Sequence, residues 1–180
     1  SVGPDGATHQ ALEDVGLMRA IPNMKVACPA DGVETKQVLE TMMNDYGPTY
    51  LRLANTPTPN IFDDAHKFEF GRGQIYRAGT DVCIFSYGDT LHSALAAAEM
   101  LERDAVSTMV VNLASIKPLD EALVVECAKQ AARVVTVEDH QITGGLGSAV
   151  SEVLSSAFPC KVLRLGMDGF VESGKAAELY

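Results

Sequence analysis

Along most of the chain, short runs of apolar and β-branched residues alternate with longer stretches in which apolar positions recur every three or four residues. After residue 68 the short runs lie at 82–85, 109–113, 134–137 and 161–165. Runs of this length and composition predict strands. The amphipathic stretches predict helices over 90–103 and 118–132, and a further helix that begins near Gly147. Regular strand–helix alternation indicates an α/β fold with a mostly parallel sheet and right-handed crossovers.

The pattern before residue 54 is shorter. It predicts two helices and two strands, at 8–19, 33–46, 24–28 and 49–53. These are too few elements for a stable doubly wound domain, so this part looks like the rear half of one. A run at 54–64 contains two prolines beside Asn and Asp, which predicts a loop. The expected organisation is a partial domain at 1–53, a linker at 54–68 and a C-terminal domain at 69–180.

The acidic composition of the chain argues against two classes of binding partner, nucleic acids and anionic membranes. The 180 residues carry 24 acidic and 14 basic side chains, a formal net charge of −10. Such a balance argues against binding to nucleic acid or to anionic membranes, because phosphates require clustered Lys and Arg. No apolar stretch approaches the ~18–20 residues that a membrane span needs, and no signal peptide is evident. The chain opens on Ser1 rather than Met, which suggests a piece of something longer.

The four cysteines show no CxxC spacing, and each lies among apolar residues. They are therefore interpreted as small core side chains in a reducing compartment, and we expect a cytoplasmic protein without a disulfide framework or a zinc site.

The densest polar cluster spans 3–10 and precedes an apolar helical pattern. Asp5 and Gly6 are turn formers, and Thr8 is a candidate N-cap that would place His9 in the first helical turn. At a helix N-terminus the partial positive charge favours a neutral imidazole, and the free N–H groups attract anions. On this local pattern alone, a capped helix with an incidental surface histidine is the simpler interpretation.

Several segments resemble the transketolase family. Its pyrimidine-binding domain is resembled by Asp-Gly-Ala-Thr-His-Gln at 5–10, Ile-Pro-Asn-Met at 21–24 and Gly-Pro-Thr-Tyr-Leu-Arg-Leu at 47–53. Its C-terminal domain is resembled by Val-Glu-Asp-His at 137–140, Gly-Gly-Leu-Gly-Ser-Ala at 144–149 and Glu-Ser-Gly at 172–174. The resemblance covers nearly the whole chain in the right order. It is nearest to the stand-alone C-terminal subunits of split transketolases.

The resemblance implies roles for three residues. Asp5 matches the aspartate that bonds a sugar hydroxyl near the scissile bond. His9 matches the histidine that contacts the terminal hydroxyl and carbonyl region of the donor, which makes it the candidate catalytic residue. Arg52 matches the arginine that binds the sugar phosphate, and a guanidinium suits that role because its N–H groups fork onto phosphate oxygens. A surface ion pair is the alternative for Arg52. Pro4 departs from the family pattern beside Asp5.

The resemblance also implies thiamine diphosphate and magnesium (Mg²⁺) as cofactors. The glutamate that activates the thiamine ring lies upstream of Ser1 in the family, and the diphosphate motif belongs to another domain. We therefore assign no cofactor-binding or metal-binding residue in this chain, and expect it to be incomplete and inactive alone. The implied partner is an N-terminal transketolase subunit or domain, in a homodimer or a heterotetramer.

The implied function is transfer of a two-carbon ketol unit between sugar phosphates, in the pentose phosphate pathway of carbohydrate metabolism. One alternative is a 1-deoxyxylulose-5-phosphate synthase-like enzyme, although the Glu-Ser-Gly at 172–174 favours transketolase. Another is a non-catalytic dimerisation module, which would have no use for Asp5, His9 and Arg52.

A third alternative is a nucleotide-binding protein that uses the glycine-rich loop at 144–147. The dinucleotide fingerprint needs Gly or Ala where Val150 stands, so a structural turn is favoured. His140 is interpreted as a domain-interface or turn residue rather than a metal ligand. His66 and His92 are interpreted as solvated.

Overall fold

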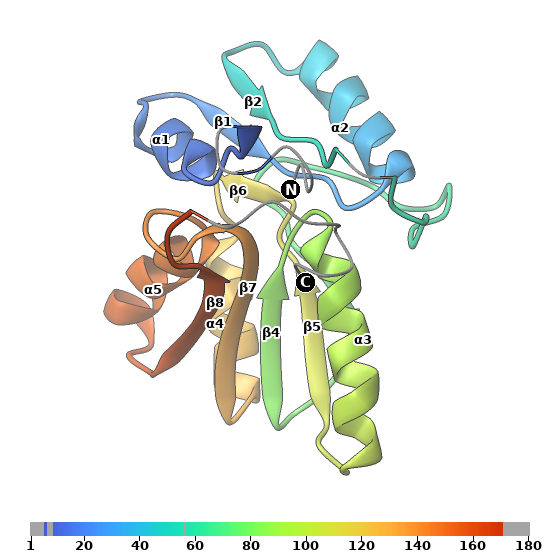
Figure 1. Cartoon of the computed structure of the whole chain (residues 1–180), viewed down its shortest axis with the longest axis vertical. Coiled ribbons are helices and arrows are strands. Elements are labelled where there is room, and N and C mark those ends of the chain that lie inside the picture. The colour runs from blue at the N-terminus through green and yellow to red at the C-terminus, as the bar shows by residue number, and fades with distance from the viewer. Residues whose placement is uncertain (1–5, 7–8, 56, 171–180) are drawn as a thin grey trace.

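The computed structural model describes residues 6, 9–55 and 57–170 of the chain. Figure 1 shows a small N-terminal section stacked on the end of a larger C-terminal sheet. The N-terminal section contains α1 (Asp14–Ala20), β1 (Lys25–Ala27), α2 (Gly32–Asn44) and β2 (Thr49–Leu51). None of the helices in the described part of the chain is long and apolar enough to cross a membrane.

The larger sheet has five strands in the order β3-β5-β4-β7-β8. They are β3 (Gln74–Arg77), β4 (Val82–Ser86), β5 (Thr108–Asn112), β7 (Arg133–Gln141) and β8 (Val162–Met167). The pairs β4–β5, β4–β7 and β7–β8 are parallel, and only the edge strand β3 runs antiparallel. The α/β fold with a mostly parallel sheet is therefore confirmed.

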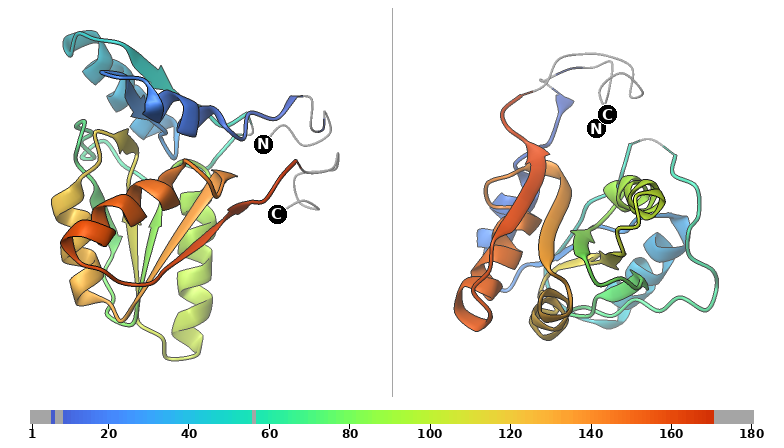
Figure 2. Two further views of the ribbon diagram at one scale, coloured as in Figure 1. Left: turned by 90° about the vertical axis from the view of Figure 1, so that its left-hand side faces the viewer. Right: turned by 90° about the horizontal axis from the view of Figure 1, so that it is seen from below.

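Helices cover both faces of this sheet (Figure 2). They are α3 (Thr90–Arg103), α4 (Glu121–Gln130) and α5 (Leu146–Ala157). Because side chains alternate along a strand, Ile84 packs in one core with Leu91 of α3, while Phe85 packs in the other with Val124 of α4 and Val150 of α5. The core therefore lies on both sides of the central strands, as expected for a doubly covered parallel sheet.

The two sections share a second sheet. Its strand order is β2-β1-β6, in which β1 pairs parallel with β2 and antiparallel with β6 (Ser115–Lys117). Strand β6 follows β5 directly, so the C-terminal section supplies a strand to the N-terminal one. The sections are thus joined by backbone hydrogen bonds as well as by the linker predicted at 54–68, whose described residues form neither helix nor strand.

Helix α1 begins later than predicted. The sequence predicts a helix from residue 8 with Thr8 as N-cap, but α1 begins at Asp14 and its N-cap is Glu13. Thr8 lies outside the described residues, and His9 precedes the helix instead of occupying its first turn. The segment before the helix is held by tertiary contacts: Gln141 N donates to Leu12 O at 2.8 Å. The predicted place of His9 in the first turn of that helix is therefore wrong.

Candidate functional site

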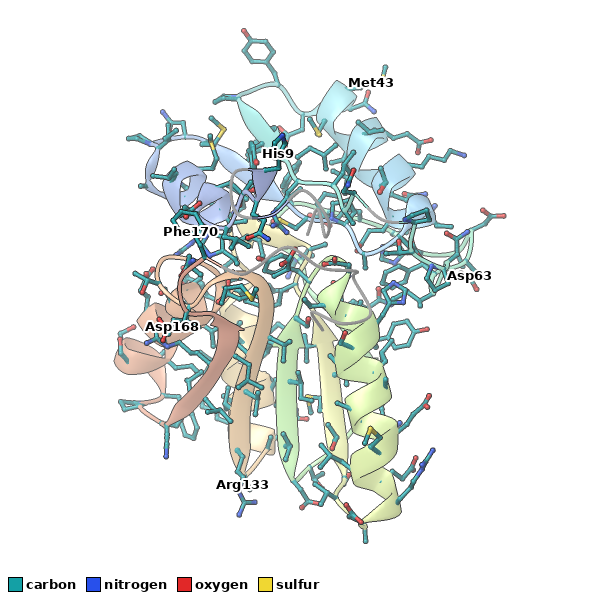
Figure 3. All side chains as sticks on the ribbon, in the orientation of Figure 1. His9, Met43, Asp63, Arg133, Asp168 and Phe170 are labelled. Carbon is teal, nitrogen blue, oxygen red and sulfur yellow. The ribbon has the colours of Figure 1, made fainter. Side chains whose placement is uncertain are left out.

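Two of the three predicted site residues lie at one small cavity. His9 comes from the segment before α1 (Figure 3), and Arg52 follows β2 directly. Both line a cavity of about 170 Å³ together with Gln10, Asp14, Tyr50 and Asn55. The His9 side chain is exposed. Asp5 lies outside the described residues, and its role stays a prediction.

The Arg52 side chain is mostly buried between two carboxylates, with 14% of it exposed. Its Nε donates to Asp14 Oδ2 at 3.0 Å, and its Nη2 donates to Asp139 Oδ2 at 3.4 Å and to the carbonyl of Ala11 at 3.1 Å. Burial alone would lower the pKa of Arg52, but the neighbouring acidic groups raise it, so the guanidinium stays charged. The sequence alternative for Arg52 was a surface ion pair; the pair exists, and it is buried.

Phosphate binding by Arg52 stays a prediction. One guanidinium faces two carboxylates, which leaves a local charge of the wrong sign for a phosphate. Against that, the structure gives Arg52 Nη1 no hydrogen-bond partner within the described part of the chain, so two N–H donors remain for a ligand.

Buried polar atoms without partners adjoin the cavity. Asp14 Oδ2 accepts from Tyr50 Oη at 2.7 Å as well as from Arg52, while Asp14 Oδ1 has no partner within the described residues. The Gln10 side-chain amide is likewise buried without a partner there. Buried polar groups are normally hydrogen-bonded, so the cavity suits a polar ligand or ordered water. Burial, followed by the hydrogen bond to Asp14, raises the pKa of Tyr50 to about 12.

The end of β7, in the C-terminal section, contacts the segments that line the cavity. His140 Nε2 accepts from Gly16 N at 3.1 Å, and Nδ1 lies 2.7 Å from the carbonyl of Gln141. One ring nitrogen therefore accepts and the other donates, which fixes a neutral tautomer. His140 is completely buried between the two sections, so its interpretation as an interface residue is confirmed.

The glycine-rich loop is a structural turn, as predicted. The backbone N–H groups of Leu146 and Gly147 donate to the two oxygens of Glu138 at 2.6 and 2.9 Å. A Cβ on Gly145 would lie 1.9 Å from Glu138 Oε2. The Glu138 carboxylate therefore takes the place at the N-terminus of α5 that a dinucleotide phosphate would occupy. Burial raises the pKa of Glu138, and the two backbone hydrogen bonds oppose that shift.

The expectation of a solvated His66 is wrong. His66 is buried, stacks on Phe62 with ring centroids 3.9 Å apart, and lies 3.2 Å from Glu34 Oε1. Glu34 is itself buried and also accepts from Ala30 N and Asn112 Nδ2. A buried carboxylate needs hydrogen-bond donors, and one of the donors to Glu34 is Asn112, 78 residues away in the chain. His92 is also partly buried, and its Nε2 lies 3.2 Å from the carbonyl of Ala30.

Sequence reasoning does not single out Asp14, Tyr50 or Asp139, which complete the surroundings of Arg52. Each lies within or beside a segment that carries the family resemblance, and that position was the available signal. Among the described residues, no group of three or more His, Cys, Asp or Glu side chains could hold a metal ion.

Comparison with known families gives two adjoining matches. The profile described as "Transketolase, pyrimidine binding domain" matches residues 1–59. The profile described as "Transketolase, C-terminal domain" matches residues 71–180. The first match contains the segments of His9 and Arg52, and the second contains β7 with Asp139.

Known proteins similar to this chain include one from Methanocaldococcus jannaschii described as "Putative transketolase C-terminal section", 44% identical over 99% of this chain and 57% of its own length. A 1-deoxy-D-xylulose-5-phosphate synthase from Parasynechococcus marenigrum is 39% identical over 92% of this chain and 26% of its own length. A solved structure titled as a split-gene transketolase, an inactive β4 tetramer, superposes with a TM-score of 0.89 at 43% identity, covering 91% of this chain and 55% of that one. The chain therefore spans little more than half of even the shorter of these proteins.

Proposed function

Because the chain belongs to the transketolase family, we propose that it is the C-terminal section of an enzyme that transfers a two-carbon ketol unit between sugar phosphates. The observation that carries the proposal is the cavity at which His9 and Arg52 meet, within the part that matches the pyrimidine-binding domain. In this proposal Asp5 accepts a hydrogen bond from a sugar hydroxyl, and His9 donates one to the carbonyl oxygen of the donor sugar. Arg52 Nη1 contacts the sugar phosphate.

The family depends on thiamine diphosphate, but the described residues do not form a complete site for it. The cavity beside His9 measures about 170 Å³, whereas cofactor sites usually measure about 300–1,000 Å³. Nor do the described residues offer a cluster of metal ligands. We therefore propose that an N-terminal transketolase subunit or domain holds the cofactor and its Mg²⁺.

The N-terminal transketolase subunit or domain is also the proposed obligatory partner of this chain, in a dimer or a heterotetramer. The N-terminal part of this chain leaves large apolar side chains in solvent: Met43, labelled in Figure 3, is 86% exposed, and Tyr46 is fully exposed. We propose that the partner covers these exposed apolar side chains. The cytoplasm is the proposed compartment, since all four cysteines are free thiols.

The test is an activity assay of the purified chain with and without an N-terminal transketolase subunit, each with saturating thiamine diphosphate and Mg²⁺. We expect ketol transfer between a ketose phosphate and an aldose phosphate only when this chain and the N-terminal subunit are both present. Turnover by the 180-residue chain alone would contradict the proposed incompleteness.

The same preparations, assayed a second time with pyruvate in place of the ketose phosphate, decide between the alternatives. Formation of 1-deoxyxylulose 5-phosphate without ketol transfer would assign the chain to the synthase, the activity of one of its relatives. A well-formed complex that catalyses neither reaction would instead support a non-catalytic dimerisation module.

A further inference from the structure

The segment that carries His9 is held in place by the C-terminal section. The contacts come from three consecutive residues at the end of β7, namely Asp139, His140 and Gln141. Gln141 N donates to Leu12 O at 2.8 Å, and His140 Nε2 accepts from Gly16 N at 3.1 Å. The third contact is indirect, since Asp139 reaches this segment through Arg52.

Arg52 connects Asp139 to the main chain two residues after His9. Its Nη2 carries two hydrogens, one directed to Asp139 Oδ2 at 3.4 Å and one to the carbonyl of Ala11 at 3.1 Å. The Asp139 side chain is 3% exposed. An ionised carboxylate at that depth requires a paired cation, so Asp139 and Arg52 orient each other. Asp14 then holds Nε from the opposite side.

We propose that Asp139 is a positioning residue for His9, which acts by fixing the Arg52 guanidinium and through it the carbonyl of Ala11. The C-terminal section thereby contributes to the reaction without touching the substrate. This inference rests on the proposed function, because it takes His9 to be the group that meets the donor sugar. A shift on the order of 1 Å in a reacting group can reduce a rate about 100-fold. Greater mobility of the His9 segment would therefore lower kcat.

The first test uses the 180-residue chain without any partner. Asp139→Asn keeps the side-chain shape but removes the charge, and amide hydrogen exchange is measured along the segment 9–16. We expect exchange there to speed up several-fold in Asp139→Asn. The control Asp104→Asn, at an exposed residue after α3, should leave exchange unchanged. Equal exchange in Asp139→Asn and the unmodified chain would overturn the proposal.

The second test is a double-mutant cycle in the assembled enzyme. With an unphosphorylated donor, Asp139→Asn should lower kcat on the order of 10- to 100-fold with little change in KM, because Arg52 is proposed to hold only the phosphate. In a His9→Ala background the same substitution should lower kcat no further, because the group that it positions is absent. Additive losses would mean that Asp139 acts on the fold alone, and would overturn the positioning role.

The two tests separate this inference from the proposed function. If the assembled complex shows no ketol transfer, the proposed function fails, while hydrogen exchange still decides whether Asp139 orders the His9 segment. If exchange speeds up but the cycle is additive, Asp139 orders the segment and its link to His9 chemistry is wrong.

Discussion

At the scale of single residues, His9 is the group most directly open to test. It lies at the cavity and its side chain is exposed there. If the imidazole donates to an oxygen on which charge develops, its contribution is larger in the transition state than in the ground state. His9→Ala should then lower kcat of the assembled enzyme by roughly 10- to 1,000-fold, with phosphorylated and unphosphorylated donors alike. An unchanged kcat in a correctly folded complex would remove His9 from the reaction.

Arg52 allows two outcomes that kinetics can distinguish. If Nη1 binds the sugar phosphate, Arg52→Ala should mainly raise KM for phosphorylated donors, with about a 10- to 100-fold loss in kcat/KM. Unphosphorylated donors should then be nearly unaffected. If Arg52 only pairs with Asp14 and Asp139, both donor types should lose activity equally, because the whole site is disturbed. Steady-state kinetics with one donor of each type makes the comparison.

Tyr50 gives a prediction about pH. Burial and the hydrogen bond to Asp14 raise its pKa to about 12 in the folded protein, above the ordinary value near 10. The folded state therefore holds this proton longer than the unfolded state, and the associated stability is lost as pH rises from about 10 to about 12. Over that interval the free energy of unfolding should fall more steeply in the unmodified chain than in Tyr50→Phe. Denaturant titrations at several pH values measure both slopes, and parallel slopes would contradict the assignment.

At the scale of the elements, the glycine-rich loop depends on the absence of a side chain. A Cβ on Gly145 would meet both Glu138 Oε2 and His140 Nδ1 at less than 3 Å. Gly145→Ala should therefore displace Glu138 and leave a buried carboxylate poorly paired, destabilising the chain by about 3 kcal/mol. The matched control is Gly32→Ala, whose Cβ would lie 3.4 Å from its nearest neighbour, Asn60 Oδ1. Chemical denaturation compares the two variants, and equal losses would contradict this account of the loop.

Local pattern was sufficient for most elements but not for all. The helix predicted at 90–103 coincides with α3 (Thr90–Arg103). Its apolar residues recur at helical spacing, and Leu91, Ala94 and Ala98 are buried. Strand β3 (Gln74–Arg77) was missed, since it is an exposed antiparallel edge strand without a buried apolar run. Strand β6 was missed because its three residues are paired with β1, about 90 positions earlier in the chain. Such pairing is invisible to a local pattern.

The candidate site also combines features that the sequence predicts with features that depend on long-range contacts. The resemblance located His9 and Arg52, and the structure brings them to one cavity. It could not anticipate that Arg52 is enclosed by Asp14 and Asp139, because those partners lie 38 and 87 residues away. Nor could it anticipate the late start of α1, where the preceding Leu12 carbonyl accepts a hydrogen bond from Gln141 of β7. What escaped prediction in both cases is long-range contact.

At the scale of the whole molecule, the two sections should behave as one folding unit. They share the β2-β1-β6 sheet. Glu34 of the N-terminal section, only 1% exposed, accepts a hydrogen bond from Asn112 Nδ2 of the C-terminal section at 2.7 Å. Separating the sections would expose the edges of β1 and β6 and remove a hydrogen-bond donor from the Glu34 carboxylate, a loss of about 1–3 kcal/mol. Neither section can therefore unfold at little cost while the other remains intact.

Thermal unfolding of the 180-residue chain should accordingly be a single cooperative transition, with equal calorimetric and van't Hoff enthalpies. Tyrosine fluorescence and far-ultraviolet circular dichroism should follow the same curve. Asn112→Ala should lower the midpoint without splitting the transition, because it weakens the joint that both sections share. The exposed control Asp104→Asn should leave the midpoint nearly unchanged. Two resolved transitions in the unmodified chain, at several protein concentrations, would show instead that residues 1–53 fold independently of the C-terminal section.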